Sequence, residues 1–283
     1  MRSETRVAVV GHVEWVQFAR VPHVPAAGEV MHAAEPFEEP AGGGAVAAVQ
    51  LARLAGKAVL LSALGEDEQG RRSVVRLEEL GVRVHAASRS GPTRRAVTLV
   101  DDARERTITT FGPRLEPVGD DTQLPWSALA EMDAVYFTAG DLGALRAARA
   151  ARVLVASPRA IDALGHGVPL DALVLSADDA IEREEAAGVR GETELVVWTN
   201  GAHGGAYRTR AGESGTWAAS PPPGPAVDSY GCGDSFAAGL AYGLGADMTV
   251  PAALDLAARC GAACLTGRGP YERQLRLRSP SHG

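Results

Sequence analysis

The sequence lacks both an excess of basic residues and a long hydrophobic segment. It has 35 acidic against 28 basic residues, a formal net charge of −7. Because a nucleic-acid backbone demands a concentrated basic surface, nucleic acid is not expected as the main partner. The first apolar run, Val7–Val10, is too short for a signal peptide or a membrane span, and no later run reaches spanning length. We therefore expect a cytoplasmic protein without a membrane partner.

Cysteine is also scarce, and one common cofactor motif is missing. The three cysteines, Cys232, Cys260 and Cys264, are too few for a disulfide framework. Cys260 and Cys264 stand one helical turn apart in an Ala-rich stretch, which is typical of small buried residues.

Gly11 after the first apolar run is followed by His12, not by the glycines of a G-x-G-x-x-G loop, which argues against a dinucleotide oxidoreductase.

Short apolar runs alternate with helical patterns along most of the chain. Such alternation predicts a parallel sheet with helices on both faces, and 283 residues suffice for one large α/β domain spanning residues 1–283. We expect a doubly wound, mostly parallel sheet. The predicted strands are 7–10, 59–61, 82–86, 134–138, 153–156, 172–175 and 195–198, with strand-like pieces at 206–209 and 216–219; the predicted helices are 42–55, 73–80, 142–150, 178–187, 234–244 and 251–265.

One segment interrupts this alternation. Residues 95–100 and 106–110 read as two strands with no helix between them, which predicts a hairpin. Together with the region 15–30, this hairpin could form a small sheet outside the core, with lid segments at about 13–35 and 92–112. The alternative is an edge extension of the main sheet.

The chemically most informative stretch is Gly231-Cys232-Gly233-Asp234, where a helical pattern begins. Free backbone N–H groups and the helix dipole at a helix start favour an anion. A carboxylate beside such an anion site is what phosphoryl transfer needs, with Asp234 as base and Gly231, Cys232 and Gly233 as the anion hole. The alternative is a Gly-rich turn in which Asp234 only stabilises the helix start. Near a helix N-terminus the Cys232 thiol is expected to have a lowered pKa.

This motif resembles the D-T-x-G-A-G-D signature of the PfkB (ribokinase-like) family of carbohydrate and nucleoside kinases. The resemblance runs along nearly the whole chain, through Gly28-Glu29, the glycine-rich segment 40–44, the G-x-D-x-x-G-like segment 65–70 and the strand 105–108. It implies a ribokinase-like fold whose small β-sheet lid closes over the substrate and can pair with the lid of a second subunit, as a homodimer. It also implies ATP and Mg²⁺, and K⁺ in some members.

On the nucleotide side, the resemblance implies five binding residues and two metal-site acids. Ser176 and Asp179 occupy the positions of the family's N-x-x-E motif, which serves the magnesium and phosphate network; the alternative is that Ser176 and Asp178 cap a helix. Asp228 matches an acid that helps to hold a monovalent cation, or else it is a turn carboxylate. The remaining nucleotide-side residues are Thr199, Gly201 and Gly204, from the T-x-G-x-x-G loop, and Thr266.

On the acceptor side, Gly42, Gly43 and Gly44 let backbone approach a sugar, or they form the tight entry to a helix. Here the chain departs from the family, because Val16 and Val46 replace a substrate-gripping Asp and Asn. We expect either a less polar substrate or one held by Glu14, His12 and His32. Val46 itself keeps the position of a substrate contact, and Asp141 is another candidate contact or a helix cap.

These patterns predict an ATP-dependent phosphotransferase that phosphorylates a hydroxyl of a small sugar-like or nucleoside substrate. The alternative is a ligand-binding regulatory protein of the same fold with little or no turnover.

Overall fold

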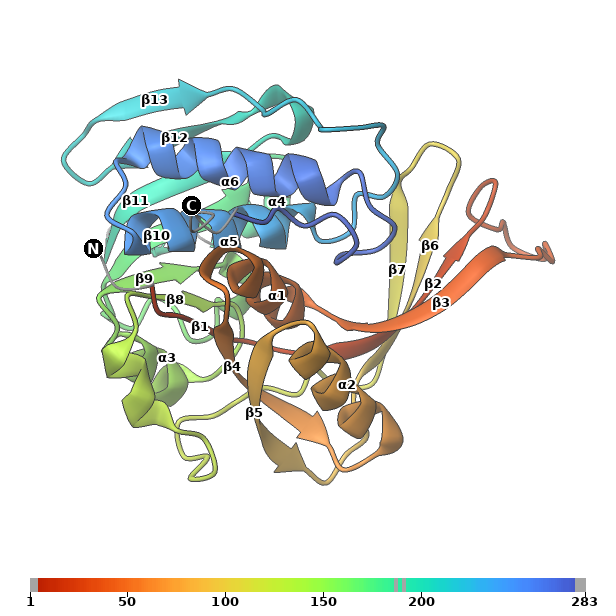
Figure 1. The fold of residues 1–283 in the computed structure, drawn as a ribbon, viewed down its shortest axis with the longest axis horizontal. Helices are drawn as coiled ribbons and strands as arrows, with labels where there is room; N and C mark the ends of the chain where they lie inside the picture. Colours follow the sequence, from red (N-terminus) through yellow and green to blue (C-terminus); the bar gives the residue numbers. More distant parts are fainter. Residues whose placement is uncertain (1–4, 186–187, 190–191, 278–283) are drawn as a thin grey trace, which may run out of the picture.

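The structure, a computed structural model, describes residues 5–185, 188–189 and 192–277, and a nine-stranded sheet forms its centre (Figure 1). All neighbouring strands run parallel except at one edge, where β11–β12 and β12–β13 are antiparallel. The predicted mostly parallel α/β sheet is thus confirmed. In spatial order its strands are β13 (Ser214–Trp217), β12 (Gly205–Thr209), β11 (Thr193–Thr199), β10 (Leu170–Ser176), β9 (Val153–Ala156), β8 (Ala134–Phe137), β1 (Val7–Val10), β4 (Ala58–Gly65) and β5 (Val82–Arg89).

Helices cover both faces of this sheet because its central strands are apolar on both sides. In β1, Val7 and Val9 belong to one buried cluster and Ala8 and Val10 to another. The first cluster lies under α1 and α5, and α6 packs on α5; the second lies under α3. The helices are α1 (Gly43–Ala55), α2 (Glu68–Glu79), α3 (Leu142–Ala148), α4 (Ala180–Glu185), α5 (Cys232–Gly245) and α6 (Val250–Cys264).

Local signals account for the helix ends. Gly42 and Gly56, which flank α1, have φ values of 86° and 83°, a region that favours glycine. Asp67 begins α2 by accepting a hydrogen bond from the N–H of Gly70 at 2.9 Å. The helix predicted at 178–187 is observed as α4, and the predicted end at Ala187 lies outside the described residues.

The predicted small sheet exists and is separate from the main one, so the alternative of an edge extension is wrong. Its order is β3 (Ala34–Ala41), β2 (Glu14–Arg20), β6 (Arg95–Val100) and β7 (Arg106–Phe111), and it projects from one side of the core (Figure 1). We call this sheet the lid. β3 lies almost wholly beyond the lid segment predicted at 13–35. It was missed because its Glu- and Pro-rich sequence shows no apolar alternation and six of its eight residues are not buried.

Aromatic side chains join the lid to the core. Phe18 of β2 is fully buried, stacks on Phe37 of β3 at 4.7 Å between ring centroids, and meets Tyr230 edge-on at 4.9 Å. Tyr230 directly precedes the Gly231–Asp234 segment, so the lid contacts the predicted catalytic motif. At the opposite edge β7 is exposed throughout, including Ile108 and Phe111.

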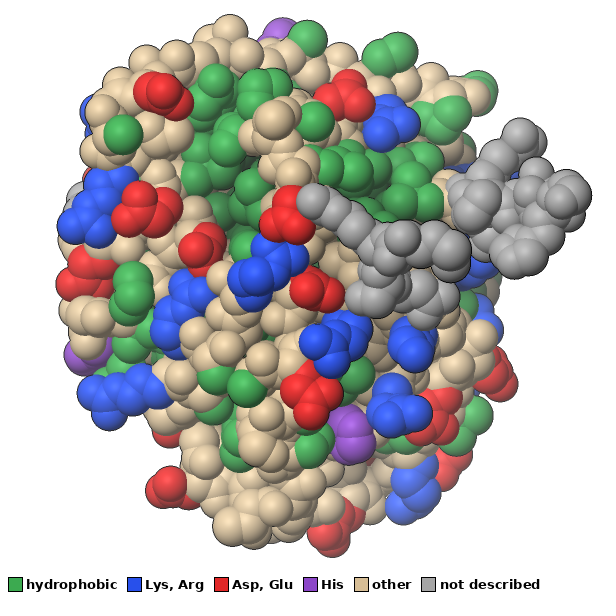
Figure 2. All heavy atoms as spheres, turned by 60° about the vertical axis from the view of Figure 1, so that its left-hand side comes forward, with side chains coloured by type: hydrophobic (Ala, Val, Ile, Leu, Met, Phe, Trp, Pro, Cys, Tyr) green, Lys and Arg blue, Asp and Glu red, His purple; other side chains and the backbone are tan. Residues whose placement is uncertain are grey.

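The distribution of charged side chains on the surface and the apolar character of the helices are both consistent with the composition of the chain. On the face drawn in Figure 2, acidic and basic side chains are interspersed. Within the described part of the chain, no helix combines the length and apolar character needed to cross a membrane.

Close contact between α5 and α6 yields a stability prediction. A Cβ atom at Gly239 of α5 would lie 2.8 Å from the Cα of Ala257 in α6, so Gly239→Val should lower the free energy of unfolding by about 2 kcal/mol or more. Gly91→Val is the control, because a Cβ at Gly91 meets nothing within 4 Å; its effect should stay within about 0.5 kcal/mol. Denaturant titration of both variants measures the difference, and equal values would contradict the packing argument.

Candidate active site

The predicted motifs meet where strands β1 and β8 end and helices α1 and α5 begin. A Cβ atom at Gly43 would lie 3.0 Å from Asp234 Oδ1 and 3.0 Å from Thr138 Oγ1, directly after β8. Gly43 and Asp234, far apart in sequence, are therefore in close approach. Carboxyl ends of parallel strands are where α/β proteins bind ligands.

The three predicted glycines of this loop have different roles. Gly42, at φ 86°, lies beside His12 and Glu14, since a Cβ there would be 3.0 Å from His12 Nε2 and 3.3 Å from Glu14 Cγ. Gly44 is packed against backbone, because its Cβ would be 2.6 Å from the His12 carbonyl oxygen. Gly42 and Gly43 thus border the site, whereas Gly44 allows α1 to begin against the end of β1.

The turn that begins α5 has the shape expected of an anion site. Gly231 has φ 80°, and a Cβ there would lie 2.9 Å from Val46 Cγ1, so only glycine fits. Gly233 is exposed, and a Cβ there would meet nothing within 4 Å. The Cys232 N–H donates to the Ser229 carbonyl at 3.4 Å, so this predicted donor is partly engaged within the turn. The helix start therefore opens toward a ligand at Gly233.

The Asp234 carboxylate is desolvated and faces cations. Burial raises its pKa, and the charges of Arg159 and Arg106 act in the opposite direction. Arg106 belongs to the lid strand β7 and donates to the Ser229 hydroxyl at 3.1 Å. The lid thus reaches the catalytic motif through a charged side chain as well as through Phe18.

Arg159 is a site residue that sequence reasoning missed. It follows β9 and lies 3.7 Å (Nη2 to Oε1) from Glu182, and the charges of Asp234, Glu182 and Asp179 raise its pKa against the effect of burial. The guanidinium therefore lies beside Glu182, and its charge interacts with those of the predicted base Asp234 and of Asp179. Its immediate sequence context, Ser157-Pro158-Arg159, carries no recognisable signal.

The predicted metal-side residues lie at the start of α4. Ser176 Oγ accepts the N–H of Asp178 at 3.3 Å, as the cap alternative expects of Ser176. Asp179 Oδ1 accepts the N–H of Glu182 at 3.1 Å, a contact at the helix start that the cap alternative, made for Ser176 and Asp178, did not include. Glu182, which was not predicted, accepts the Ser176 N–H at 2.9 Å with Oε2 and turns Oε1 toward Arg159. The Glu182 carboxylate thus faces Arg159, and the charge of Asp179, directly before the helix, acts on Arg159 as well.

The donor set fits magnesium only in part. Among the described residues, no group of three or more His, Cys, Asp or Glu side chains is arranged to hold a metal ion. Mg²⁺ prefers oxygen ligands and usually keeps water and nucleotide phosphates in its shell. Asp179 and Glu182 offer oxygens of the right kind for such a shared shell.

The nucleotide-side residues surround the ends of β11 and α6. Thr199 Oγ1 donates to the Leu175 carbonyl at 3.4 Å and Thr266 Oγ1 to the Ala263 carbonyl at 2.8 Å. Gly204 has φ 80°, and a Cβ there would lie 2.1 Å from the Trp217 carbonyl oxygen, so this turn requires glycine. Gly201, also at positive φ, begins the same turn. Their contact with nucleotide stays a prediction.

Asp228 is buried and held by backbone. Its Oδ1 accepts the Tyr230 N–H at 2.8 Å and its Oδ2 the Gly269 N–H at 3.1 Å. The turn-carboxylate alternative therefore describes its observed contacts, and a cation role stays a prediction.

Glu14 and His12, predicted to hold the acceptor, lie beside Gly42. Glu14 is buried and lies 3.4 Å from Arg94 Nε; burial raises its pKa, which Arg94 opposes. Burial and the nearby charges of Arg114, Arg159 and Arg94 lower the pKa of His12 to about 3, so this imidazole is neutral. His32 lies exposed on the lid loop and does not join them.

Two predicted apolar features do not belong to the site surface. Val46 is fully buried in the core against Gly231, so its side chain has no surface with which to meet an acceptor. Val16 is fully buried as well. The inference of a less polar substrate rested on these two residues and loses its support, because neither lines the site.

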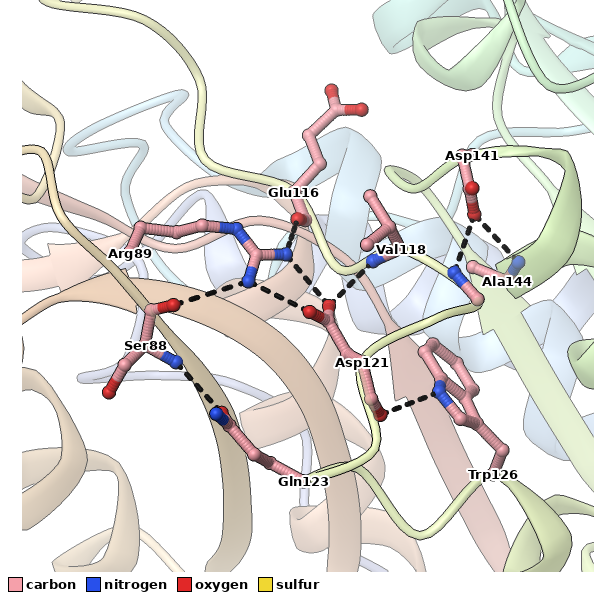
Figure 3. Close-up of polar contacts among 10 residues, drawn as sticks. Ser88, Arg89, Glu116, Val118, Asp121, Gln123, Trp126, Asp141 and Ala144 are labelled. Atoms are coloured by element: carbon pink, nitrogen blue, oxygen red, sulfur yellow. Dashed lines mark hydrogen bonds and ion pairs between the residues drawn. The ribbon is translucent and has the colours of Figure 1, made fainter.

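Asp141 caps α3 and anchors the linker that leaves the lid. Its Oδ1 accepts the N–H groups of Ala144 and Gly119, both at 2.8 Å (Figure 3). In the same linker Asp121 pairs with Arg89 at 2.7 Å, and Arg89 also donates to the Glu116 carbonyl at 2.7 Å. The cap alternative thus describes these contacts of Asp141, and a substrate contact stays a prediction.

The Cys232 thiol differs from expectation. Its pKa is raised, first by a hydrogen bond with the Cys264 thiol and then by burial. The predicted lowering by the helix start is therefore wrong, because the neighbouring thiol and desolvation outweigh it. Cys260 and Cys264 are buried, as predicted.

Comparison with known proteins agrees with this geometry. The sequence profile of the pfkB family carbohydrate kinases matches residues 4–159 and 170–275. An ATP-dependent ribose-1-phosphate kinase of Halopiger xanaduensis is 32% identical over 281 residues, covering 91% of this chain and 90% of that protein. The ribokinase of Thermotoga maritima superposes with a TM-score of 0.77 at 21% identity, covering 96% of each chain. The adenosine kinase of Sinorhizobium meliloti gives 0.77 at 17% identity, over 95% of this chain and 96% of that one.

The fold is therefore ribokinase-like, and the matched regions include the Gly42–Gly44 loop, Arg159 and the Asp234 motif. By its sequence and its architecture, this chain belongs to the pfkB family of carbohydrate kinases.

Proposed function

We propose that the protein phosphorylates a hydroxyl of a small sugar-like molecule with ATP. The observation that carries this proposal is the Asp234 carboxylate at the open start of α5, in contact distance of Gly43. An acceptor hydroxyl between these groups would give its proton to Asp234. Its oxygen then bonds to the γ-phosphorus of ATP as the bond to the β,γ-bridging oxygen breaks, and ADP leaves. The relative named a ribose-1-phosphate kinase supports a sugar over a nucleoside as acceptor.

Charges around the transferred group support this assignment. Backbone N–H groups of Gly231, Cys232 and Gly233 hold the developing negative charge, with the Gly233 end the most open. Arg159, whose charge interacts with those of Asp234, Glu182 and Asp179, would add a cation near the transferred phosphoryl group. When bound, Mg²⁺ neutralises the ATP phosphates; Ser176, Asp179 and Glu182 would serve its network.

The remaining predicted residues are assigned roles from their positions in the fold. Thr199, Gly201, Gly204 and Thr266 would border the nucleotide, and Asp228 would serve a monovalent cation such as K⁺. Pairing of two subunits through the lid is supported by the exposed strand β7 with Ile108 and Phe111.

Asp234→Asn tests the base. The amide keeps the size of the side chain but cannot take the proton, so kcat should fall by roughly a hundredfold or more while ATP still binds. ADP release across a panel of sugars and nucleosides measures turnover, and calorimetry measures ATP binding. Asp255→Asn, on the exposed face of α6, is the control and should match the wild type. Full turnover in Asp234→Asn would disprove the assignment; ATP binding without turnover in the wild type would favour a regulatory binding protein.

Arg159→Gln tests the cation through the pH profile. Because Arg159 lowers the pKa of Asp234, its loss should raise that pKa. Because the base is active when deprotonated, the acidic limb of the plot of kcat against pH should move to higher pH. The kcat on the plateau should fall at least about tenfold, because a cation near the phosphoryl group is lost. Arg106 and Glu14 also face Asp234 and stay in place. Arg208→Gln, exposed on β12, is the control; an unshifted limb in Arg159→Gln would contradict the coupling.

A further inference from the structure

Two arginines approach the acceptor side of the site from different segments. Arg94 precedes β6, and its Nη2 donates to the Thr110 hydroxyl at 2.8 Å, which fixes it against β7. Arg114 lies in the linker after β7, where it pairs with Glu116 and donates through Nη2 to the Arg159 carbonyl at 2.9 Å. Arg94 Nε lies 3.4 Å from the Glu14 carboxylate beside Gly42, and the charges of Arg94 and Arg114 both act on His12 and on Glu14.

Two buried polar atoms beside Gly42 have no hydrogen-bond partner in the described part of the chain. Across the residues that the structure describes, the buried His12 Nδ1 and Arg94 Nε form no hydrogen bond. Arg94 Nε has only the ion pair with Glu14 at 3.4 Å. Because a buried polar atom without a hydrogen-bond partner costs about 1–3 kcal/mol, such atoms are typical of a site that a ligand completes.

The linker holds Arg114 firmly in this place. Arg89 bridges Asp121 and the Glu116 carbonyl, so the segment that follows Arg114 is tied to the end of β5 (Figure 3). The guanidinium of Arg114 has five N–H donors, of which Glu116 and the Arg159 carbonyl take two. Donors therefore remain for a further anion.

We propose that the acceptor carries an anionic group, a phosphate ester or a carboxylate, and that Arg94 and Arg114 bind it. Guanidinium groups suit both oxyanions, since their donors match the spacing of two oxygens. The neutral His12 adds a hydrogen-bonding group without repelling the cations. The inference rests on the proposed function, and for a phosphorylated acceptor the product is a sugar bisphosphate. It replaces the expectation of a less polar substrate.

The first experiment uses the wild-type protein and paired acceptors. ADP release is measured with ribose, ribose 1-phosphate and ribose 5-phosphate, with fructose and fructose 6-phosphate, and with gluconate. At least one anionic compound should exceed its neutral counterpart in kcat/KM by about a hundredfold, because an arginine pair left without its anion is penalised. The phosphate and gluconate arms distinguish the two sources of the anion. A neutral sugar used as well as its phosphates and gluconate would overturn the inference.

The second experiment uses Arg114→Gln and Arg94→Gln. Each substitution should raise KM for the anionic acceptor about 10- to 100-fold. The KM for ATP should change by less than about threefold, and the KM for a neutral sugar should stay unchanged. Arg95→Gln, exposed next to Arg94, is the matched control, and thermal unfolding checks that each variant folds.

The outcomes separate this inference from the proposed function. Turnover that depends on Asp234 but not on either arginine would overturn the inference alone. A rise confined to KM for ATP would overturn it too, by placing the arginines on the nucleotide side. No Asp234-dependent ADP release with any acceptor would overturn both.

Discussion

The site depends on one close approach, that of the starts of α1 and α5 beside the ends of β1 and β8. Gly43 has no side chain, so Asp234 and Thr138 come to within 3.0 Å of where its Cβ would be. Gly44 and Gly231 are equally constrained, by the backbone of His12 and by Val46. Because these contacts are backbone against backbone or against fixed side chains, a larger residue at any of them would separate the two helix starts. An acceptor held at α1 would then lie out of reach of the base at α5.

Much of the fold could be predicted because the sequences of buried parallel strands are short, continuous apolar runs. Val7–Val10 and Val153–Ala156 were placed in full, and the stop of α1 at Gly56 follows from its left-handed conformation. Strand β3 could not be predicted, since its Glu- and Pro-rich sequence resembles a loop and its pairing with β2 comes from a distant part of the chain. Tertiary pairing, not local preference, makes it a strand.

The candidate site was predictable only where a motif carries it. Asp234 and the glycines beside it are encoded in two short segments, and the structure brings them together. Arg94, Arg114, Arg159 and Glu182 come from four different segments, and nothing in their neighbouring residues marks them. Val46 was predicted as an acceptor contact from its position in the glycine motif, whereas the structure buries its side chain in the core. Asp141 shows the converse, a conspicuous acid whose observed hydrogen bonds brace a helix and a linker.

The arrangement of charges couples substrate binding to the state of the base. Arg159 and Arg106 oppose the burial that raises the pKa of Asp234, so in the free enzyme they favour the carboxylate. If ATP binds as proposed, its phosphate groups would bring negative charge close to the same guanidinium groups and offset their effect. The affinity of Asp234, the proposed base, for a proton would then rise when the acceptor hydroxyl has to give one up. Since Arg106 belongs to the lid and Arg159 to the core, this adjustment is strongest when the lid lies against the core, as the contact of Phe18 with Tyr230 holds it.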